Sequence, residues 1–415
     1  MPALPAARAT HTGIPVLHAY TAAGECYIAC VTSHRFENLR ALEFPGTERA
    51  IYLNATGFGP LPDRTRTALN NFTDQRHRNE LRDADLLDAL ANARRSAARL
   101  IRASPAEIAL TPNTNVGINI AANAVLERAA DKATILLSDG EFPANVYPWL
   151  ALQQHGFTVE IVRSDERGMP NEDSIIARIR AGDVAAFTVS FVQFASGYRA
   201  DLATLGRACA ESDTLFIVDA IQGLGAVPLD VQQTPVDILA CGGQKWLCSP
   251  WGSGFTYVRR ALIATFDPVF PGWLAFKASS DFTRLLNYEY EFVDDARRFE
   301  TGSLAFQDQL GMSVSIDLLL ELGIGHIWQH LLALQQPLIE WAGSRDVQIV
   351  SDLTASCRSG ILCLRPRNAG VVHQALLAAG VACAFRENAI RLAAHWYNTP
   401  HEIARVIEIM DSVVA

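Results

Sequence analysis

The sequence lacks the features of several large protein classes. Its eight cysteines are scattered along the chain, without the paired spacing of a structural metal site. No apolar run reaches the length that spans a membrane, and the net charge of −9 argues against a nucleic-acid surface. The N-terminus has neither the cationic start nor the long apolar block of a signal peptide. These absences favour a cytoplasmic globular protein with reduced cysteines, no metal, no membrane association and no nucleic-acid partner.

The chain is instead long and rich in apolar residues. It has 415 residues, of which 49% are hydrophobic and 19% are charged. That length exceeds one ordinary domain and suits two domains with sizeable cores. We expect residues 1–34 to form an N-terminal extension, for which disorder and a misassigned start site both stay open.

The stretch from Thr214 to Arg260 organises the rest of the chain. Leu215–Val218 is a short apolar run that ends at Asp219, which is typical of a buried parallel strand. A second run, Val236–Ala240, leads through two glycines to Lys245. In open α/β sheets, ligands bind beyond the carboxyl ends of the strands. The sequence therefore predicts that an acid and an amine share one ligand site.

An aspartate and a lysine in this arrangement suit pyridoxal 5′-phosphate (PLP). This cofactor needs a lysine amine for its Schiff base and an acid that keeps its ring nitrogen protonated, so that the ring acts as an electron sink. The ordinary alternative is a capping Asp219 and a surface Lys245. The setting of Lys245 argues against it, because glycines, Trp246 and Trp251 surround this lysine, and desolvation lowers the pKa of an amine.

A second candidate element precedes this stretch. Residues Thr65–Leu100 have helical apolar spacing, and the following chain changes from a strand pattern to a helix pattern. Between the strand and the second helix stand Asn113, Thr114 and Asn115. The free N–H groups and positive end of such a helix bind phosphate readily. A plain helix N-cap has the same sequence pattern.

Together these motifs resemble the class V aminotransferases, a PLP-dependent family that includes cysteine desulfurases, kynureninases and carbon–sulfur lyases. The resemblance runs from about Tyr52 to the C-terminus. It implies the α/β, type I PLP-dependent transferase fold, with a mostly parallel, doubly wound sheet in a large domain over residues 65–303. A smaller C-terminal α+β domain would take residues 304–415. Residues 35–64 would form an opening segment near the substrate pocket.

The resemblance also implies roles for single residues. Lys245 would form the Schiff base and later move the Cα proton, and Asp219 would hold the ring nitrogen protonated. Phe142 would stack on the ring, where desulfurases have a histidine that can move protons. Gln222 would contact the phenolic oxygen, and Arg391 would bind the substrate carboxylate with its planar guanidinium. The residues expected around the phosphate are Asn113, Thr114, Asn115, Gln244 and, reaching across a homodimer, Ser303.

Two of these roles have ordinary alternatives. Phe142 would then be a plain core residue, because stacking geometry cannot be read from sequence. Arg391 lies in an apolar strand, where a charge is unusual unless it is paired, and its alternative is a pair with an internal acid.

The connection before Arg391 bears on the reaction. Desulfurases carry a nucleophilic cysteine there on a longer loop, whereas Cys383 falls on the expected strand, eight positions before Arg391. The sequence therefore favours β-elimination or transamination of an α-amino acid. Activity like that of a cysteine desulfurase, a selenocysteine lyase or an epimerase stays open. A non-catalytic PLP-binding regulatory protein is the alternative from another class.

Overall fold

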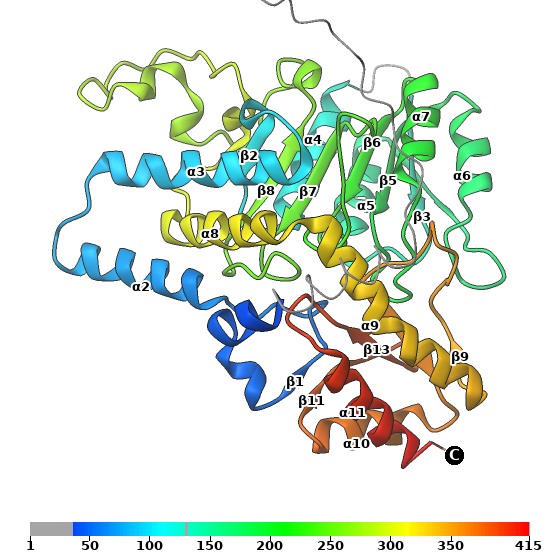
Figure 1. Cartoon of the computed structure of the whole chain (residues 1–415). Helices are drawn as coiled ribbons and strands as arrows, with labels where there is room; N and C mark the ends of the chain where they lie inside the picture. Colours follow the sequence, from blue (N-terminus) through cyan, green and yellow to red (C-terminus); the bar gives the residue numbers. More distant parts are fainter. Residues whose placement is uncertain (1–35, 129–131, 415) are drawn as a thin grey trace, which may run out of the picture.

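Figure 1 shows the protein as a computed structural model that describes residues 36–128 and 132–414. The extension expected over residues 1–34 lies outside the described residues, as do Cys26 and Cys30. The described chain contains a seven-stranded sheet and a four-stranded sheet, joined by long helices. The predicted α/β architecture, with a large sheet followed by a smaller C-terminal unit, is therefore present.

The larger sheet has the strand order β2-β8-β7-β6-β5-β3-β4. From β7 to β4 every neighbouring pair is parallel, whereas β8 runs antiparallel to both of its neighbours. The mostly parallel sheet that the sequence predicted is confirmed. Its strands are β2 (Ile108–Leu110), β3 (Thr134–Ser138), β4 (Thr158–Val162), β5 (Val184–Ser190), β6 (Leu215–Asp219), β7 (Ile238–Gly242) and β8 (Gly254–Val258).

Both faces of this sheet are covered, which is why its strands read as continuous apolar runs. Successive side chains of a strand point to opposite faces, so Phe216 and Val218 of β6 join one apolar cluster and Leu215 and Ile217 join another. The second cluster includes residues of α4 (Thr114–Arg128) and α5 (Tyr147–Ala151). The first cluster includes residues of α3 (Asp83–Ile101), α6 (Glu172–Ile179), α7 (Leu202–Glu211) and α8 (Phe306–Leu322), and it continues into the C-terminal unit.

The helical stretch predicted over Thr65–Leu100 is two helices rather than one. The structure has α2 (Asp63–His77) and α3, and the chain turns between them at residues 78–82. Asn79 in this turn has a positive φ of 57°, which ends helical geometry. Both helices pack against α8, so the change of direction lets two helices meet the same partner.

The C-terminal unit is built on a four-stranded antiparallel sheet of order β12-β13-β10-β9. Strand β1 (Ile51–Tyr52) pairs in parallel with β11, so the opening segment belongs structurally to this unit. Cys383, expected on a strand, lies at the junction between β11 and β12. The remaining elements are α9 (Ile324–Ser344), β9 (Gln348–Ile349), β10 (Ile361–Arg365), α10 (Ala369–Ala378), β11 (Val381–Ala382), β12 (Ala384–Arg386), β13 (Ala389–Ala393) and α11 (Pro400–Asp411).

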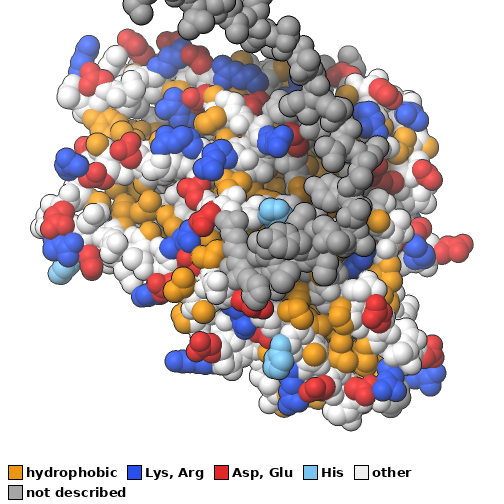
Figure 2. All heavy atoms as spheres, viewed as in Figure 1, with side chains coloured by type: hydrophobic (Ala, Val, Ile, Leu, Met, Phe, Trp, Pro, Cys, Tyr) orange, Lys and Arg blue, Asp and Glu red, His pale blue; other side chains and the backbone are white. Residues whose placement is uncertain are grey.

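The surface and the helix lengths bear on the expected partners. Figure 2 shows Lys and Arg side chains interspersed with Asp and Glu over the visible face, with apolar side chains between them. Within the described residues, no single helix is long and apolar enough to cross a bilayer. Helices α8 and α9 meet that test only as a pair, and they are bent by 74° where they join.

Candidate active site at the carboxyl edge of the large sheet

Asp219 and Lys245 lie where the sequence predicted, at the carboxyl edge of the large sheet. Asp219 is the last residue of β6 and stands in register with Ser190 of β5 and Ala240 of β7. Strand β7 ends at Gly242, and Lys245 follows three residues later in a turn. The two side chains therefore come from adjacent parallel strands and reach the same edge.

Asp219 is a buried carboxylate with few partners. Its side chain is 3% exposed and accepts a hydrogen bond of 3.0 Å from the backbone N–H of Ile221. Burial raises the pKa of Asp219 to about 6, and the nearby charge of Lys245 partly opposes this rise. Among the described residues no basic group lies within ion-pair distance of it, so the carboxylate can receive a cation from a bound molecule.

Lys245 is a partly buried amine. Burial lowers the pKa of Lys245 to about 8, the charge of Asp219 opposes this, and the charge of Arg391 lowers it further. Its Nζ lies 5.5 Å from the ring centre of Phe142. An amine with such a pKa is partly deprotonated near neutral pH, as a nucleophilic lysine must be.

Phe142 is not a plain core residue. Its ring is 42% exposed, and the edge of the Phe194 ring packs against it with 5.3 Å between centroids. One ring face is thus close to Lys245 while the Phe194 contact holds its orientation. An exposed ring beside an active amine is suited to stacking on a flat ligand.

The residues expected around the phosphate gather at the start of α4. Thr114 opens the helix and its Oγ1 accepts a hydrogen bond of 2.9 Å from the N–H of Gly242, at the end of β7. Asn113 caps the N–H of Val116 at 3.1 Å, and Asn115 donates to the carbonyl of Ala144. The capping alternative is therefore realised for Asn113, while the Thr114 hydroxyl proton is left for another acceptor.

The opening segment closes over this edge. Gln222 donates to the carbonyl of Thr56 at 3.2 Å and accepts a hydrogen bond of 2.9 Å from the indole N–H of Trp246. The N–H of Gly59 donates to the carbonyl of Gln244 at 2.8 Å. Any side chain at Gly59 would overlap the backbone carbonyl of Lys245, so glycine is required for this approach.

Arg391 comes to the site from the C-terminal unit. It lies on β13, is 3% exposed, and donates from Nη1 to the carbonyl of Phe194 at 2.7 Å. Its Nε is buried without a hydrogen-bond partner, and no acid in the described chain forms an ion pair with it. Burial lowers the pKa of Arg391 to about 10. The alternative of a pair with an internal acid is therefore not realised among the described residues, and the guanidinium can donate to a carboxylate.

Ser303 is an expected site residue that makes no contact with the other described site residues through a hydrogen bond. It is exposed, and no hydrogen bond or ion pair joins it to other described residues. It follows the turn η8 (Ala296–Phe299) and Glu300, whose carboxylate accepts two bonds from Arg94. This buried pair anchors the turn that presents Ser303 to solvent.

Sequence reasoning missed three groups that support these residues. Glu141, next to Phe142, is buried and accepts four hydrogen bonds. Phe194 supplies a ring that packs against Phe142 and a carbonyl that accepts from Arg391. It belongs to no sequence motif. His395 holds the carbonyl of Trp246 at 2.9 Å. Only His395 had a signal, because it is a polar residue in an apolar and aromatic stretch.

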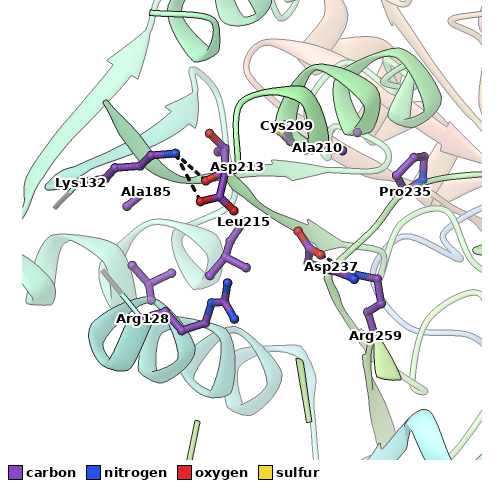
Figure 3. A pocket seen from close by; sticks show the side chains of 13 residues that line it. Arg128, Lys132, Ala185, Cys209, Ala210, Asp213, Leu215, Pro235, Asp237 and Arg259 are labelled. Atoms are coloured by element: carbon purple, nitrogen blue, oxygen red, sulfur yellow. Dashed lines mark hydrogen bonds and ion pairs between the residues drawn. The ribbon is translucent and has the colours of Figure 1, made fainter. Parts of the chain in front are cut away.

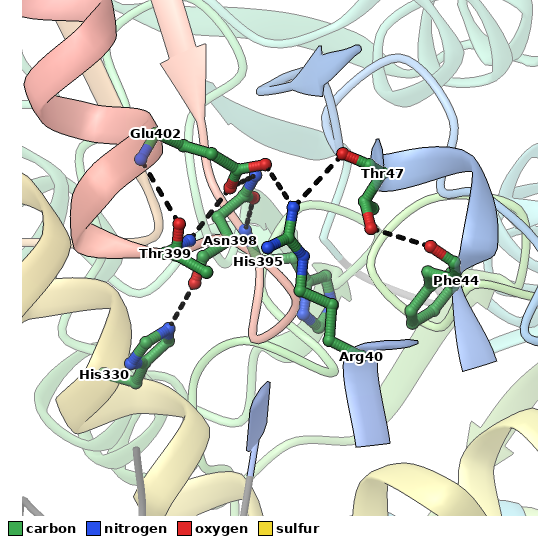
Figure 4. A network of polar contacts seen from close by, with 8 residues as sticks. All are labelled: Arg40, Phe44, Thr47, His330, His395, Asn398, Thr399 and Glu402. Atoms are coloured by element: carbon green, nitrogen blue, oxygen red, sulfur yellow. Dashed lines mark hydrogen bonds and ion pairs between the residues drawn. The ribbon is translucent and has the colours of Figure 1, made fainter. Parts of the chain in front are cut away.

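His395 belongs to a polar network that links the opening segment to the C-terminal unit (Figure 4). Its Nδ1 accepts from the N–H of Trp396, so Nε2 carries the proton donated to Trp246. Burial lowers the pKa of His395 to about 4, which keeps the ring neutral. Further out, Asn398 donates to Glu402, and Glu402 pairs with Arg40 at 2.5 Å. Trp246, the residue after Lys245, is thereby held at its indole N–H by Gln222 and at its carbonyl by His395.

A cavity of about 430 Å³ lies at the opposite edge of the same sheet (Figure 3). Its lining includes Leu215, the first residue of β6, whereas Asp219 is the last. Two of the basic residues there lie beside an acid: Lys132 is 3.9 Å from Asp213, and Arg259 contacts Asp237 at 2.7 Å. By contrast, Asp219 and Arg391 at the carboxyl edge form no ion pair with any described residue.

The residues at the carboxyl edge fit PLP. The site has a buried carboxylate without an ion pair among the described residues and a lysine with a lowered pKa. An exposed flat ring lies beside the lysine, and a helix begins with a hydroxyl that can still donate its proton. The family model described as Aminotransferase class-V matches residues 51–405. The chain belongs to the class-V aminotransferase family. Members of this family are PLP-dependent enzymes, so the expectations of an enzyme and of this cofactor are confirmed.

Individual proteins agree with this family. An uncharacterized aminotransferase, YcbU, of Bacillus subtilis is 28% identical over 90% of this chain and 97% of its own. A probable cysteine desulfurase of Methanothermobacter thermautotrophicus is 28% identical over 91% of this chain and 98% of its own. Among solved structures, a cysteine desulfurase from Thermococcus onnurineus superposes with a TM-score of 0.82 at 21% identity, covering 91% of this chain and 98% of that one. The type I fold predicted from the sequence is therefore confirmed.

Proposed function

We propose that the protein is a PLP-dependent enzyme that acts on an α-amino acid by β-elimination or transamination, with Lys245 as its central residue. The observation that carries the proposal is the meeting of three separate segments at one edge. Lys245 follows β7, Phe142 follows β3 and lies 5.5 Å from the lysine Nζ, and Arg391 comes from β13 with an unpaired guanidinium. Bound PLP would supply an electron sink next to the amino group of the substrate.

Each residue would then have a distinct task. Lys245 would hold the cofactor covalently and afterwards take the proton from Cα, which its lowered pKa supports. Asp219 would face the ring nitrogen, Phe142 would lie against one face of the ring, and Gln222 would contact the phenolic oxygen. Arg391 would bind the substrate carboxylate and so orient Cα toward Lys245. The phosphate would be held by Asn113, Thr114, Asn115, Gln244 and, across a dimer, Ser303.

The cysteines support elimination or transamination over desulfuration, although relatives are named desulfurases. Cys383 is buried between β11 and β12, and burial raises the pKa of its thiol to about 12. A thiolate nucleophile needs the opposite environment, exposed and with a lowered pKa. Of the six described cysteines, five are buried. All six are free, which supports a reducing, cytoplasmic location.

We infer that the enzyme is a homodimer with shared active sites. A groove of about 410 Å³ with a mainly apolar lining runs beside the start of α4, between Val116 and Ile120 on one side and Phe270 and Thr301 on the other. Phe270 is exposed, and Ser303 lies two residues beyond Thr301. Covering this groove with a second copy would remove apolar surface from water and bring an exposed hydroxyl near a phosphate site.

The test begins with the purified protein. It should be yellow, and borohydride should fix the cofactor to a peptide that contains Lys245. An amino-acid panel, followed for pyruvate, ammonia, alanine and sulfide, then separates elimination from transamination and desulfuration. A Lys245→Ala protein that still forms the reducible linkage, or a wild type that binds PLP but converts no amino acid, would reject the proposal. The second result would favour a regulatory protein.

A further inference from the structure

Next to Phe142 lies a buried carboxylate that the proposed chemistry does not use. Glu141 is 8% exposed, and its two oxygens accept four hydrogen bonds. Oε1 accepts from the backbone N–H of Ser190 at 2.9 Å and from the amide of Gln193 at 2.6 Å. Oε2 accepts from the hydroxyl of Ser190 at 2.6 Å and from the amide of Asn145 at 2.8 Å. Within the described chain, no Lys, Arg or His forms an ion pair with it.

These four bonds hold three structures together. Ser190 is the last residue of β5 and stands in register with Asp219. Asn145 closes the loop that carries Phe142, and its own oxygen accepts from Thr188 of β5 at 2.7 Å. Gln193 begins a tight turn in which its backbone bonds to residues 197 and 198. The carboxylate thus ties the Phe142 loop, the end of β5 and the turn after it to one point.

The turn after β5 leads directly to Arg391. Phe194 follows Gln193, its carbonyl accepts from Nη1 of Arg391 at 2.7 Å, and its ring packs against Phe142. Phe142 and Arg391 lie on different structural units, one after β3 and the other on β13. Phe194 therefore connects Phe142 with Arg391, and Glu141 holds the residue before it, Gln193.

We propose that Glu141 is a positioning residue that fixes the spacing between the ring-stacking Phe142 and the carboxylate-binding Arg391. This role rests on the proposed function, because that function assigns ring stacking to Phe142 and carboxylate binding to Arg391. Burial raises the pKa of Glu141 to about 7, while the four hydrogen bonds favour the ionised form. Only that form accepts from all four donors. A neutral amide of the same shape presents an NH₂ group to donors on one side, so at least one tether breaks.

Glu141→Gln tests the role, and Glu107→Gln is the matched control. Glu107 is also 8% exposed and also accepts only from uncharged N–H groups, those of Ser104 and Arg260. It precedes β2 and lies at the amino edge of the sheet, away from Lys245. Loss of a buried acceptor affects stability in both variants, whereas only Glu141 connects Phe142 with Arg391.

In Glu141→Gln we expect KM for the amino acid that the wild type converts fastest to rise tenfold or more, with kcat falling less. The circular dichroism band of bound PLP should change, because Phe142 is released. Without PLP, amide hydrogen exchange should accelerate at residues 140–146 and 193–198 and stay unchanged elsewhere. Glu107→Gln should show none of these effects. If the two variants have the same KM and the same dichroism, or if exchange accelerates uniformly, the role is wrong.

A second variant keeps the test decisive if Glu141→Gln does not fold. Gln193→Met removes one donor and leaves three bonds on Glu141. It should raise KM severalfold through Phe194 and Arg391 and leave the dichroism of PLP near that of the wild type. A changed dichroism with an unchanged KM would overturn the proposed connection. Because exchange is measured without PLP, the tether can be tested even if the wild type fails to bind the cofactor.

Discussion

At the carboxyl edge of the large sheet, Asp219 and Arg391 form no ion pair with any described residue, whereas at the amino edge Lys132 and Arg259 each lie beside an aspartate. Asp219 and Arg391 are buried, and burial shifts the pKa of each toward the neutral form. At the amino edge, Arg259 lies 2.7 Å from Asp237, and Lys132 donates to the carbonyls of Ser212 and Asp213. A buried charge without an ion pair is costly to a folded protein, so the meeting of Asp219 and Arg391 beside Lys245 indicates the place where a charged ligand binds.

Among substitutions at the two edges, removal of the Lys245 amine should lower activity most. Lys245→Ala should lower kcat/KM by about 1,000-fold or more, a loss of about 4 kcal/mol of transition-state stabilisation. Lys132→Ala at the amino edge should leave kcat/KM within about twofold, because its side chain contacts only Ser212 and Asp213 at the far edge of the sheet. Steady-state kinetics on folded variants is the measurement. Equal losses in both would remove the distinction between the edges.

Arg391→Lys is expected to have the next largest effect. A lysine cannot copy the paired hydrogen bonds of a guanidinium with a carboxylate, and loss of such a buried partner costs about 2–5 kcal/mol. We expect KM for α-amino acids to rise about 30-fold or more, while PLP stays bound. Arg259→Lys, on an exposed pair, is the control. Normal turnover by Arg391→Lys, or a wild-type preference for amines without a carboxylate, would contradict this role.

The pKa of Lys245 can be compared with that of a surface lysine without any substrate. In cofactor-free protein, labelling of Lys245 with an amine reagent should rise with a midpoint near pH 8, because burial lowers its pKa to about 8. Lys277 should label only at higher pH, because Glu291 and Asp294 raise its pKa. A common midpoint for both lysines would contradict the environment described for Lys245.

The lowered pKa of Lys245 also makes the stability of the folded protein depend on pH. The pKa of Lys245 is about 8 in the folded state and 10.5 in the reference state, so between these values the unfolded chain binds more protons and stability rises with pH. Lys245→Met should therefore raise the free energy of unfolding of the cofactor-free protein at pH 7, by about 1–3 kcal/mol. The gain should disappear above pH 10.5, as denaturant titrations at several pH values would show.

The smallest effect is expected at Cys383. Cys383→Ala should keep most of the activity, because the buried thiol has a pKa of about 12 and little thiolate is present. A hundredfold loss with intact folding, about 2.7 kcal/mol, would instead identify a nucleophilic cysteine. That outcome would favour the desulfurase alternative. Sulfide release from cysteine, measured beside kcat/KM, separates the two cases.

The local sequence was enough to predict the strand that ends at Asp219 and the strand that precedes Lys245, because a short apolar, β-branched run is recognisable without tertiary information. It also determined that Arg391 lies in a buried strand, since a charge in an apolar run is recognisable without a structure. It did not determine the break between α2 and α3, because Asn79 ends the helix inside an otherwise helical pattern.

Only the tertiary structure decided which of these residues meet. Phe142 and Phe194 lie 52 positions apart, and their contact depends on where two loops leave neighbouring strands. Glu141 belongs to no sequence motif, because its role depends on four hydrogen-bond donors from three different segments. Hydrogen bonds between distant segments leave no periodic trace in the sequence, whereas strands and helices do. The local sequence therefore indicates the chemistry of single residues. The distances between these residues depend on the packed sheet and on the buried groups that hold its loops.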